Sequence, residues 1–153
     1  MMSRVGHSFI KDQMRQNDAI FAGELSGHYY VKANYTAESS SMATFALANI
    51  VSASEKPLSE LVAPLRKYFQ SGEINTKTAV PPGEVLARIK AEYSAKAKVF
   101  ELDGVTVDAW ESEGWWANVR MSNTEPLVRL NLEAKTKASM EAKRDEFLAR
   151  IRA

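Results

Sequence analysis

Apolar residues at helical spacing and short apolar runs follow one another in the first half of the chain. Residues 4–17 place their apolar side chains on one broad side, which predicts an amphipathic helix. Runs at 19–22 and 29–31 predict two strands, joined by the glycine-bearing segment GELSGH. Residues 36–52 and 57–69 then predict two helices in series, the second opened by its proline.

The small residues of the sequence QSG, at 70–72, mark a break after which the elements follow one another more densely. We expect a domain boundary at this break, with one domain in residues 1–70 and another in residues 71–153. A chain of 153 residues is long enough for one sizeable core or for two small ones.

The second half predicts a strand, a helix, three or four further strands and a closing helix. Residues 73–80 read as the first strand, and Pro81 and Pro82 introduce the helix. Gly104, after an aspartate, separates two apolar runs and signals a hairpin. Thr136 is the predicted N-cap of the closing helix. The apolar stripes of the two helices are Val85, Leu86, Ile89 and Tyr93, and Met140, Phe147, Leu148 and Ile151. This order predicts an α+β fold class, with an antiparallel sheet covered by helices on one side.

Two of these strands, at 115–122 and 127–134, alternate between apolar and polar positions. Their apolar faces would carry Trp115, Ala117, Val119 and Met121, and Val128, Leu130, Leu132 and Ala134. Because successive side chains point to opposite faces of a sheet, Arg120 and Arg129 then fall on the polar side.

The composition limits the kinds of partner that the protein binds. Lysine and arginine number 20 against 19 aspartates and glutamates, so no overall field attracts nucleic acid or an anionic membrane, and we expect neither as a partner. Any anion site must therefore be local. The chain has no cysteine, which excludes disulfides and thiolate metal sites and fits a cytoplasmic location. Its apolar runs are too short to span a bilayer, and it lacks a signal-peptide core.

A polar segment, VRMSNTEPLVR at 119–129, lies in the most strand-like part of the chain. If its flanking strands are neighbours, Arg120 and Arg129 converge at one end of the sheet, and such guanidinium groups match phosphate oxygens. The hydroxyl and amide side chains between them add neutral donors. From composition alone, an ordinary polar turn with solvated arginines, or arginines paired to Glu125 and Glu133, is an equal alternative.

The longer segment RMSNTEPLVRLNLEA resembles the C-terminal phosphate-binding loop of the α-D-phosphohexomutase family, the phosphomannomutases and phosphoglucomutases. The resemblance implies that the substrate phosphate is bound by a set of donors, namely Arg120, Ser122, Asn123, Thr124 and Arg129. It extends from about Arg4 to the C-terminus. It also implies a TATA-binding-protein-like fold for residues 71–153, preceded by the α/β remnant of the third mutase domain.

The segment GELSGH is similar to the sugar-recognition loop of the same family. The resemblance implies that Glu24, Ser26 and His28 contact hexose hydroxyls, and their carboxylate, hydroxyl and imidazole groups suit that task. The upstream segment VGHSFIKDQMR resembles another part of the family, in which His7 matches a histidine near the bound phosphosugar. Without the resemblance, GELSGH is more often a plain loop, and a histidine at a helix end is as often structural.

The tryptophans invite a sugar-stacking interpretation, because indole faces pack against sugar C–H groups. Trp110, Trp115 and Trp116 lie in strand patterns, where aromatic residues are common, so we interpret them as packing residues.

The resemblance implies an isomerase that interconverts hexose 1-phosphate and hexose 6-phosphate, of mannose and/or glucose. In that family, a phosphoserine gives a bisphosphorylated intermediate, assisted by Mg²⁺ on an aspartate-rich loop. The sequence shows neither motif, so we assign no catalytic and no metal residue and expect this chain to be inactive alone. The start at Met1 and Met2, directly before a helical pattern, suggests a C-terminal portion whose partners are the missing N-terminal domains.

A stand-alone, non-catalytic module that binds phosphosugars or serves in assembly is the alternative, because it would use the same binding groups. The preference for mannose or glucose is not readable from these residues. We also expect self-association or disorder before residue 70, where strands would be lost, and independent folding of residues 72–153.

Overall fold

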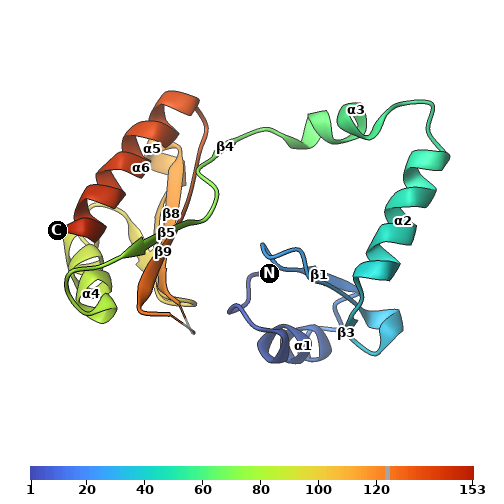
Figure 1. Ribbon diagram of the computed structural model, residues 1–153, viewed down its shortest axis with the longest axis horizontal. Coiled ribbons are helices and arrows are strands. Elements are labelled where there is room, and N and C mark those ends of the chain that lie inside the picture. Colours follow the sequence, from blue (N-terminus) through green and yellow to red (C-terminus); the bar gives the residue numbers. More distant parts are fainter. Residues whose placement is uncertain (123–124) are drawn as a thin grey trace. The chain divides into compact units, whose positions relative to one another are not determined.

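The computed structural model describes residues 1–122 and 125–153 of the chain (Figure 1). The chain forms two compact units, Met1–Leu65 and Arg66–Ala153. Each unit has a hydrophobic core of its own, and each is described here by itself.

The first unit combines a small antiparallel sheet with helices. Its helices are α1 (His7–Gln16), α2 (Ser40–Ser52) and α3 (Leu58–Val62), with short 3-10 turns at Lys32–Asn34 and Ala63–Leu65. Its strands, in the sheet order β1-β2-β3, are β1 (Phe21–Gly23), β2 (Tyr29–Val31) and β3 (Ala37–Glu38). Ile10 and Met14 of α1 pack with Tyr30 of β2, and all three side chains are buried. The predicted helix at 4–17 and the two predicted strands are therefore present.

The predicted helix at 36–52 begins later than expected because its first residues pair with β2. Ala37 and Glu38 form β3, and Ser39 then caps α2 by accepting a hydrogen bond from the backbone N–H of Met42, at 3.2 Å. The predicted helix at 57–69 also ends early, because Phe69 and Gln70 join the sheet of the second unit.

The second unit is a six-stranded antiparallel sheet covered by helices. Its strands are β4 (Phe69–Gln70), β5 (Ile74–Lys77), β6 (Lys98–Phe100), β7 (Val105–Ala109), β8 (Trp115–Met121) and β9 (Leu127–Ala134). They follow the order β4-β9-β8-β7-β6, and β5 also pairs with β9. The helices α4 (Pro82–Tyr93) and α6 (Lys137–Arg152) lie on the same side of the sheet (Figure 1). This is the predicted α+β arrangement.

The core of the second unit lies between the sheet and these two helices. The ring of Phe147 stacks on Tyr93, with centroids 5.0 Å apart, and meets Trp115 edge to face at 5.8 Å. The predicted stripes of both helices face this core. Two strand positions differ from the prediction: Met121 is exposed at the strand end, whereas Leu127 is buried.

Trp110 lies in a short helix, α5 (Trp110–Glu113), whereas the sequence analysis placed it in a strand pattern. The carboxylate of Asp108 accepts a hydrogen bond from the N–H of Trp110, and Gly114 ends the turn with a φ of 77°. A glycine adopts this left-handed conformation readily, so it allows the chain to turn from β7 into β8.

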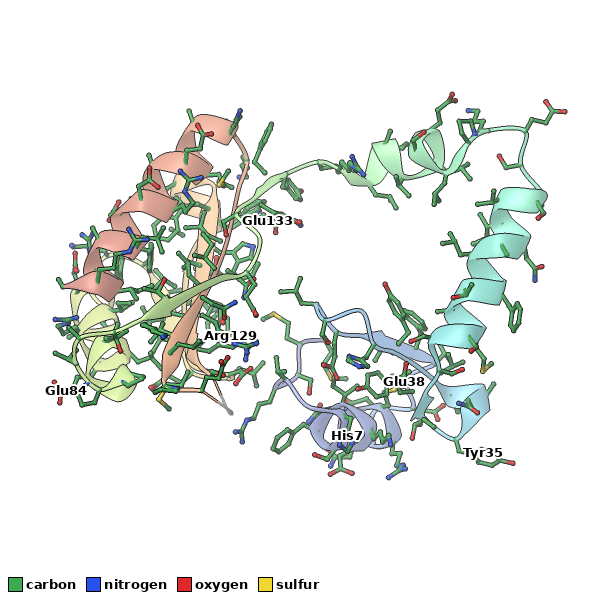
Figure 2. The ribbon with its side chains drawn as sticks, in the orientation of Figure 1. His7, Tyr35, Glu38, Glu84, Arg129 and Glu133 are labelled. Carbon is green, nitrogen blue, oxygen red and sulfur yellow. The ribbon has the colours of Figure 1, made fainter. Side chains whose placement is uncertain are left out.

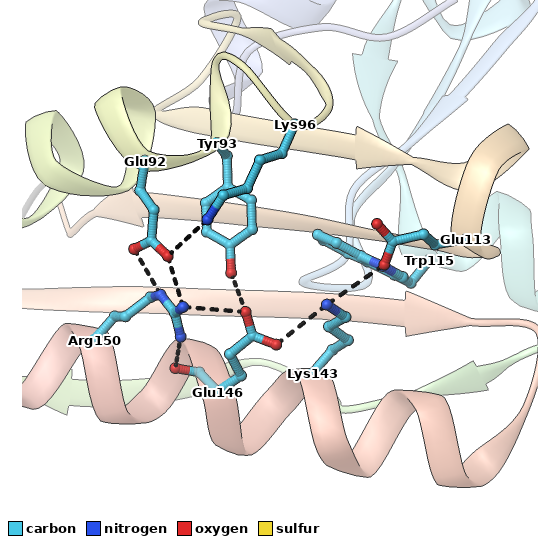
Figure 3. A network of polar contacts seen from close by, with 8 residues as sticks. All are labelled: Glu92, Tyr93, Lys96, Glu113, Trp115, Lys143, Glu146 and Arg150. Carbon is cyan, nitrogen blue, oxygen red and sulfur yellow. Dashed lines mark hydrogen bonds and ion pairs between the residues drawn. The ribbon is translucent and has the colours of Figure 1, made fainter.

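A network of polar contacts joins α4 to α6 (Figure 3). The guanidinium of Arg150 donates two hydrogen bonds to Glu92, at 2.7 and 2.6 Å. The hydroxyl of Tyr93 donates to Glu146 at 2.5 Å. Lys143 pairs with Glu146 and, at 3.5 Å, with Glu113. The network therefore fixes the two helices against each other.

Candidate functional site

The predicted sugar loop is a tight connection between β1 and β2. The backbone N–H of Glu24 donates to the carbonyl of His28 at 2.9 Å, and the N–H of Gly27 donates to the carbonyl of Glu24 at 3.0 Å. Gly27 has a φ of 85°, which a side chain would strain. The loop therefore has a defined shape, set by its own backbone hydrogen bonds.

The three predicted sugar-contacting side chains touch one another in this loop. The hydroxyl of Ser26 donates to a carboxylate oxygen of Glu24 at 3.0 Å and lies 2.8 Å from Nδ1 of His28. The other oxygen of Glu24 accepts a short hydrogen bond from the hydroxyl of Tyr30. Ser26 and His28 are exposed, so their polar groups remain open to a ligand. The structure thus brings Glu24, Ser26 and His28 together.

Tyr30 was not among the predicted site residues, although it holds the carboxylate of that loop. Its ring is 1% exposed and belongs to the core of the first unit. Burial, followed by the hydrogen bond to Glu24, raises the pKa of the Tyr30 hydroxyl well above its ordinary range. The hydroxyl therefore stays protonated and donates to Glu24.

His7 is the first residue of α1 and its side chain is exposed (Figure 2). Over the range that the structure describes, His7 makes no hydrogen bond to Glu24, Ser26 or His28. The proposed ligand contact of His7 stays a prediction.

The predicted phosphate loop connects β8 to β9. The strand register places Arg120 directly opposite Arg129. Beyond this pair, the N–H of Ser122 donates to the carbonyl of Leu127 at 2.9 Å, and the N–H of Leu127 donates to the carbonyl of Glu125 at 2.8 Å. Asn123 and Thr124 lie outside the described residues. Arg129 projects from the side of the sheet away from α4 and α6 (Figure 2).

Both arginines converge on a single carboxylate, that of Glu73. Arg120 donates through Nη2 to Oε2 at 2.8 Å, and Arg129 donates through Nη1 to Oε1 at 3.0 Å. The alternative from composition, pairing with Glu125 and Glu133, does not describe these arginines. Glu133 instead accepts hydrogen bonds from the side chains of Gln70 and Trp116, at 3.0 Å each.

The contacts with Glu73 do not use every N–H group of the two arginines. The Nη2 group of Arg129 lies 3.4 Å from the hydroxyl of Ser122, which also accepts from the N–H of Glu125 at 3.3 Å. The Nε atom of Arg129 is buried and has no hydrogen-bond partner among the described residues. Two guanidinium groups and one carboxylate leave the cluster with one net positive charge. The cluster can therefore attract an anion in a chain that is nearly neutral overall.

Sequence reasoning placed Glu73 at the start of the predicted strand at 73–80 but missed its contact with the two arginines, and the observed strand β5 begins one residue later. No spacing rule joins residue 73 to residues 120 and 129.

The two predicted groups of residues lie in separate units, with Glu24, Ser26 and His28 in the first and Arg120, Ser122 and Arg129 in the second. Among residues 1–122 and 125–153, no group of three or more histidine, aspartate or glutamate side chains is placed to hold a metal ion. No helix in those same residues is long and apolar enough to cross a membrane.

Comparison with known proteins explains why these two loops occur in one chain. Residues 1–68 match the family model described as phosphoglucomutase/phosphomannomutase, alpha/beta/alpha domain III. Residues 73–150 match the model for the C-terminal domain of the same proteins. The chain belongs to the phosphoglucomutase/phosphomannomutase family, and it corresponds to the C-terminal part of its members. The resemblance predicted from the two loops is confirmed.

The relatives are about three times as long as this chain. A phosphomannomutase from Escherichia coli is 40% identical over 99% of this chain and 33% of its own length. A phosphomannomutase from Methanocaldococcus jannaschii is 42% identical over 95% of this chain and 31% of its own. The crystal structure of a phosphoglucomutase/phosphomannomutase family protein from Burkholderia thailandensis is 25% identical, with a TM-score of 0.79, over 98% of this chain and 31% of that one.

Proposed function

We propose that this chain supplies the sugar-binding and phosphate-binding part of a phosphohexomutase. Such an isomerase interconverts hexose 1-phosphate and hexose 6-phosphate, of mannose and/or glucose, through a phosphoserine and a bisphosphorylated intermediate. The proposal is supported by the family matches and by the names of the relatives, which are phosphomannomutases. In this proposal, residues 1–70 come from the third domain and residues 71–153 from the fourth, whereas the two compact units divide between Leu65 and Arg66.

The observation that carries the proposal is the pair of guanidinium groups on β8 and β9. Arg120 and Arg129 lie opposite each other, with donors left over after their contact with Glu73. A phosphate that is not being transferred would bind there, together with Ser122, Asn123 and Thr124. Glu24, Ser26 and His28, with His7 nearby, would contact the sugar hydroxyls. Their role is orientation of the substrate, which favours reaction without any covalent step in this chain.

The remaining groups needed for phosphoryl transfer would come from the N-terminal domains that the relatives possess. These are the phosphoserine and the loop that holds Mg²⁺, whose positive charge would stabilise the charge that develops on the transferred phosphoryl group. The described residues offer no cluster of ligands for that ion, so no step here depends on it. We expect this chain alone to bind substrate but to have no mutase activity. The cytoplasmic location rests on composition and stays a prediction.

A phosphate-observed NMR titration of the 153-residue chain with mannose 1-phosphate and glucose 1-phosphate tests the proposal. We expect saturable binding that Arg120→Ala weakens by about 10- to 100-fold, because charge-assisted hydrogen bonds are lost. Arg88→Ala is the matched control. Arg88 is an exposed arginine of α4 that donates to the carbonyl of Arg150, so its removal changes the net charge equally but leaves the loop intact. Equal weakening by both variants would contradict a local phosphate site.

The alternative, a stand-alone phosphosugar-binding or assembly module, uses the same residues. It predicts the same result in the NMR titration, so only a measurement of mutase activity distinguishes the two proposals. Mutase activity that appears when the N-terminal domains of a relative are added would favour the enzyme, whereas its absence despite binding would favour the module.

A further inference from the structure

We infer that Glu73 is a positioning residue, which presets Arg120 and Arg129 as a pair before any anion binds. The inference rests on the proposed function of the loop between β8 and β9. It adds to that site a residue that directly precedes β5. Each carboxylate oxygen of Glu73 accepts from a different arginine, at 2.8 and 3.0 Å. One side chain therefore fixes the direction of two others.

Two arginines directly opposite each other on neighbouring strands repel, because like charges at such positions destabilise a sheet. The structure offsets this repulsion with one shared negative charge. The side chain of Arg120 is 11% exposed and that of Glu73 is 24% exposed, so the pair is less screened by water than an ordinary surface ion pair. Without Glu73, we expect the two guanidinium groups to move apart into solvent.

Glu73 is itself held from both sides by the strand that carries Arg129. Before it, the N–H of Ser71 donates to the carbonyl of Leu132 at 2.8 Å, and the hydroxyl of Ser71 accepts from the N–H of Leu132 at 3.0 Å. After it, β5 pairs with β9, with Asn75 opposite Arg129. Because the backbone on each side of Glu73 is hydrogen-bonded to β9, the Cα atom from which its side chain extends is held in place relative to Arg129.

The contacts with Glu73 leave several N–H donors of Arg120 and Arg129 unused. A guanidinium group carries five N–H donors, and Glu73 takes one from each arginine. The cluster retains one net positive charge, so it still attracts an anion. Holding two long side chains in place beforehand removes part of the ordering cost that binding would otherwise carry. Glu73 thus favours phosphate binding through orientation, although its own charge opposes the phosphate.

The first measurement compares the NMR signals of the arginine side chains in the absence of any ligand. Heteronuclear NMR of the arginine Nε–H groups, assigned with Arg120→Lys and Arg129→Lys, should show both signals shifted or broadened in Glu73→Gln. Glu92→Gln is the matched control, since it removes a carboxylate that pairs with Arg150 in the same unit. It should alter Arg150 alone. Unchanged Arg120 and Arg129 signals in Glu73→Gln would overturn the inference.

The second measurement is the affinity of the 153-residue chain for inorganic phosphate. We expect Glu73→Gln to weaken binding about tenfold, the low end of what loss of an orienting partner costs at metal sites, because the two arginines must then be ordered on binding. Glu73→Asp should weaken it less, and Glu92→Gln should leave it unchanged. Equal or tighter binding by Glu73→Gln would show that the carboxylate only competes with phosphate, and it would overturn the positioning role.

The two proposals fail in different ways. If the unaltered chain binds neither phosphate nor a hexose phosphate, the proposed function of the loop is wrong. The arginine Nε–H signals then still decide whether Glu73 orients the pair. If the chain binds phosphate and Glu73→Gln binds it equally well, the proposed function stands and the role of Glu73 is wrong.

Discussion

Glu92, in the network between α4 and α6, is the carboxylate whose titration has the clearest consequence for stability. Hydrogen bonds from Arg150, with a smaller contribution from Lys96, lower its pKa from an ordinary value of 4.5 to about 2. A group whose pKa is lower in the folded state stabilises that state above the unfolded pKa, and the stabilisation is lost as pH falls through the folded pKa. The relevant window is therefore from about pH 4.5 down to about pH 2.

We predict that Glu92→Gln lowers the free energy of unfolding at pH 7 by on the order of 1 kcal/mol, because the pair is about one-third exposed and partly screened. The difference from the unaltered chain should shrink as pH falls from about 4.5 to about 2. Urea unfolding at a series of pH values measures it. A difference that is constant over this window would show that Glu92 contributes through packing instead of charge.

At the residue scale, the sequence predicted which side chains share a face but not which ones meet across the sheet. Alternation along β8 and β9 placed Arg120 and Arg129 on the polar side, where the structure has them. Their partner Glu73 was not predictable, because its contact depends on how β5 is paired with β9, a long-range choice that local spacing does not encode. Tyr30 was missed for a similar reason, since its hydroxyl reaches Glu24 across a loop.

At the element scale, the start of α6 depends on one side chain. The hydroxyl of Thr136 accepts a hydrogen bond from the backbone N–H of Ser139 at 3.2 Å, as the predicted N-cap requires. We predict that Thr136→Ala lowers the free energy of unfolding of the second unit by about 1 kcal/mol.

Ser139→Ala is the control for this variant, because Ser139 contributes its backbone and not its side chain to the cap. Urea unfolding followed by far-UV circular dichroism compares the two. A loss as large in Ser139→Ala as in Thr136→Ala would mean that the cap hydrogen bond is not what stabilises the start of α6.

Long elements with strong periodicity were predictable, and short ones were not. The stripes of α4 and α6 and the alternation of β8 and β9 together bury most of the second core, so the pattern and the packing agree. In contrast, β3, β4 and α5 have two to four residues each and form because of what they pair with or turn between. Such segments are too short for a period to be visible.

At the scale of the whole chain, the two units have separate cores, so we predict two unfolding transitions. All three tryptophans lie at residues 110–116, in the second unit, and their fluorescence should report that unit alone. Phe147→Ala should lower the free energy of unfolding that the fluorescence transition reports by about 3–5 kcal/mol, because the ring is fully buried.

The circular-dichroism transition of Phe147→Ala should split, because α1, α2 and α3 of the first unit unfold as before whereas α4 and α6 of the second unit unfold earlier. A single circular-dichroism transition that shifts as a whole with the fluorescence would contradict separate units. The predicted self-association through residues before 70 is checked in the same samples by sedimentation, and it stays a prediction.

The opposed arginines of β8 and β9 also act while the chain is folding. If β9 slipped by one position against β8, every side chain of β9 would change face. Arg129 would then point into the core in the place of Val128 or Leu130, far from the carboxylate of Glu73. An unpaired buried guanidinium costs several kcal/mol, so that mispaired hairpin would not persist. The arginine that we propose as part of an anion site thus also disfavours this register shift between β8 and β9.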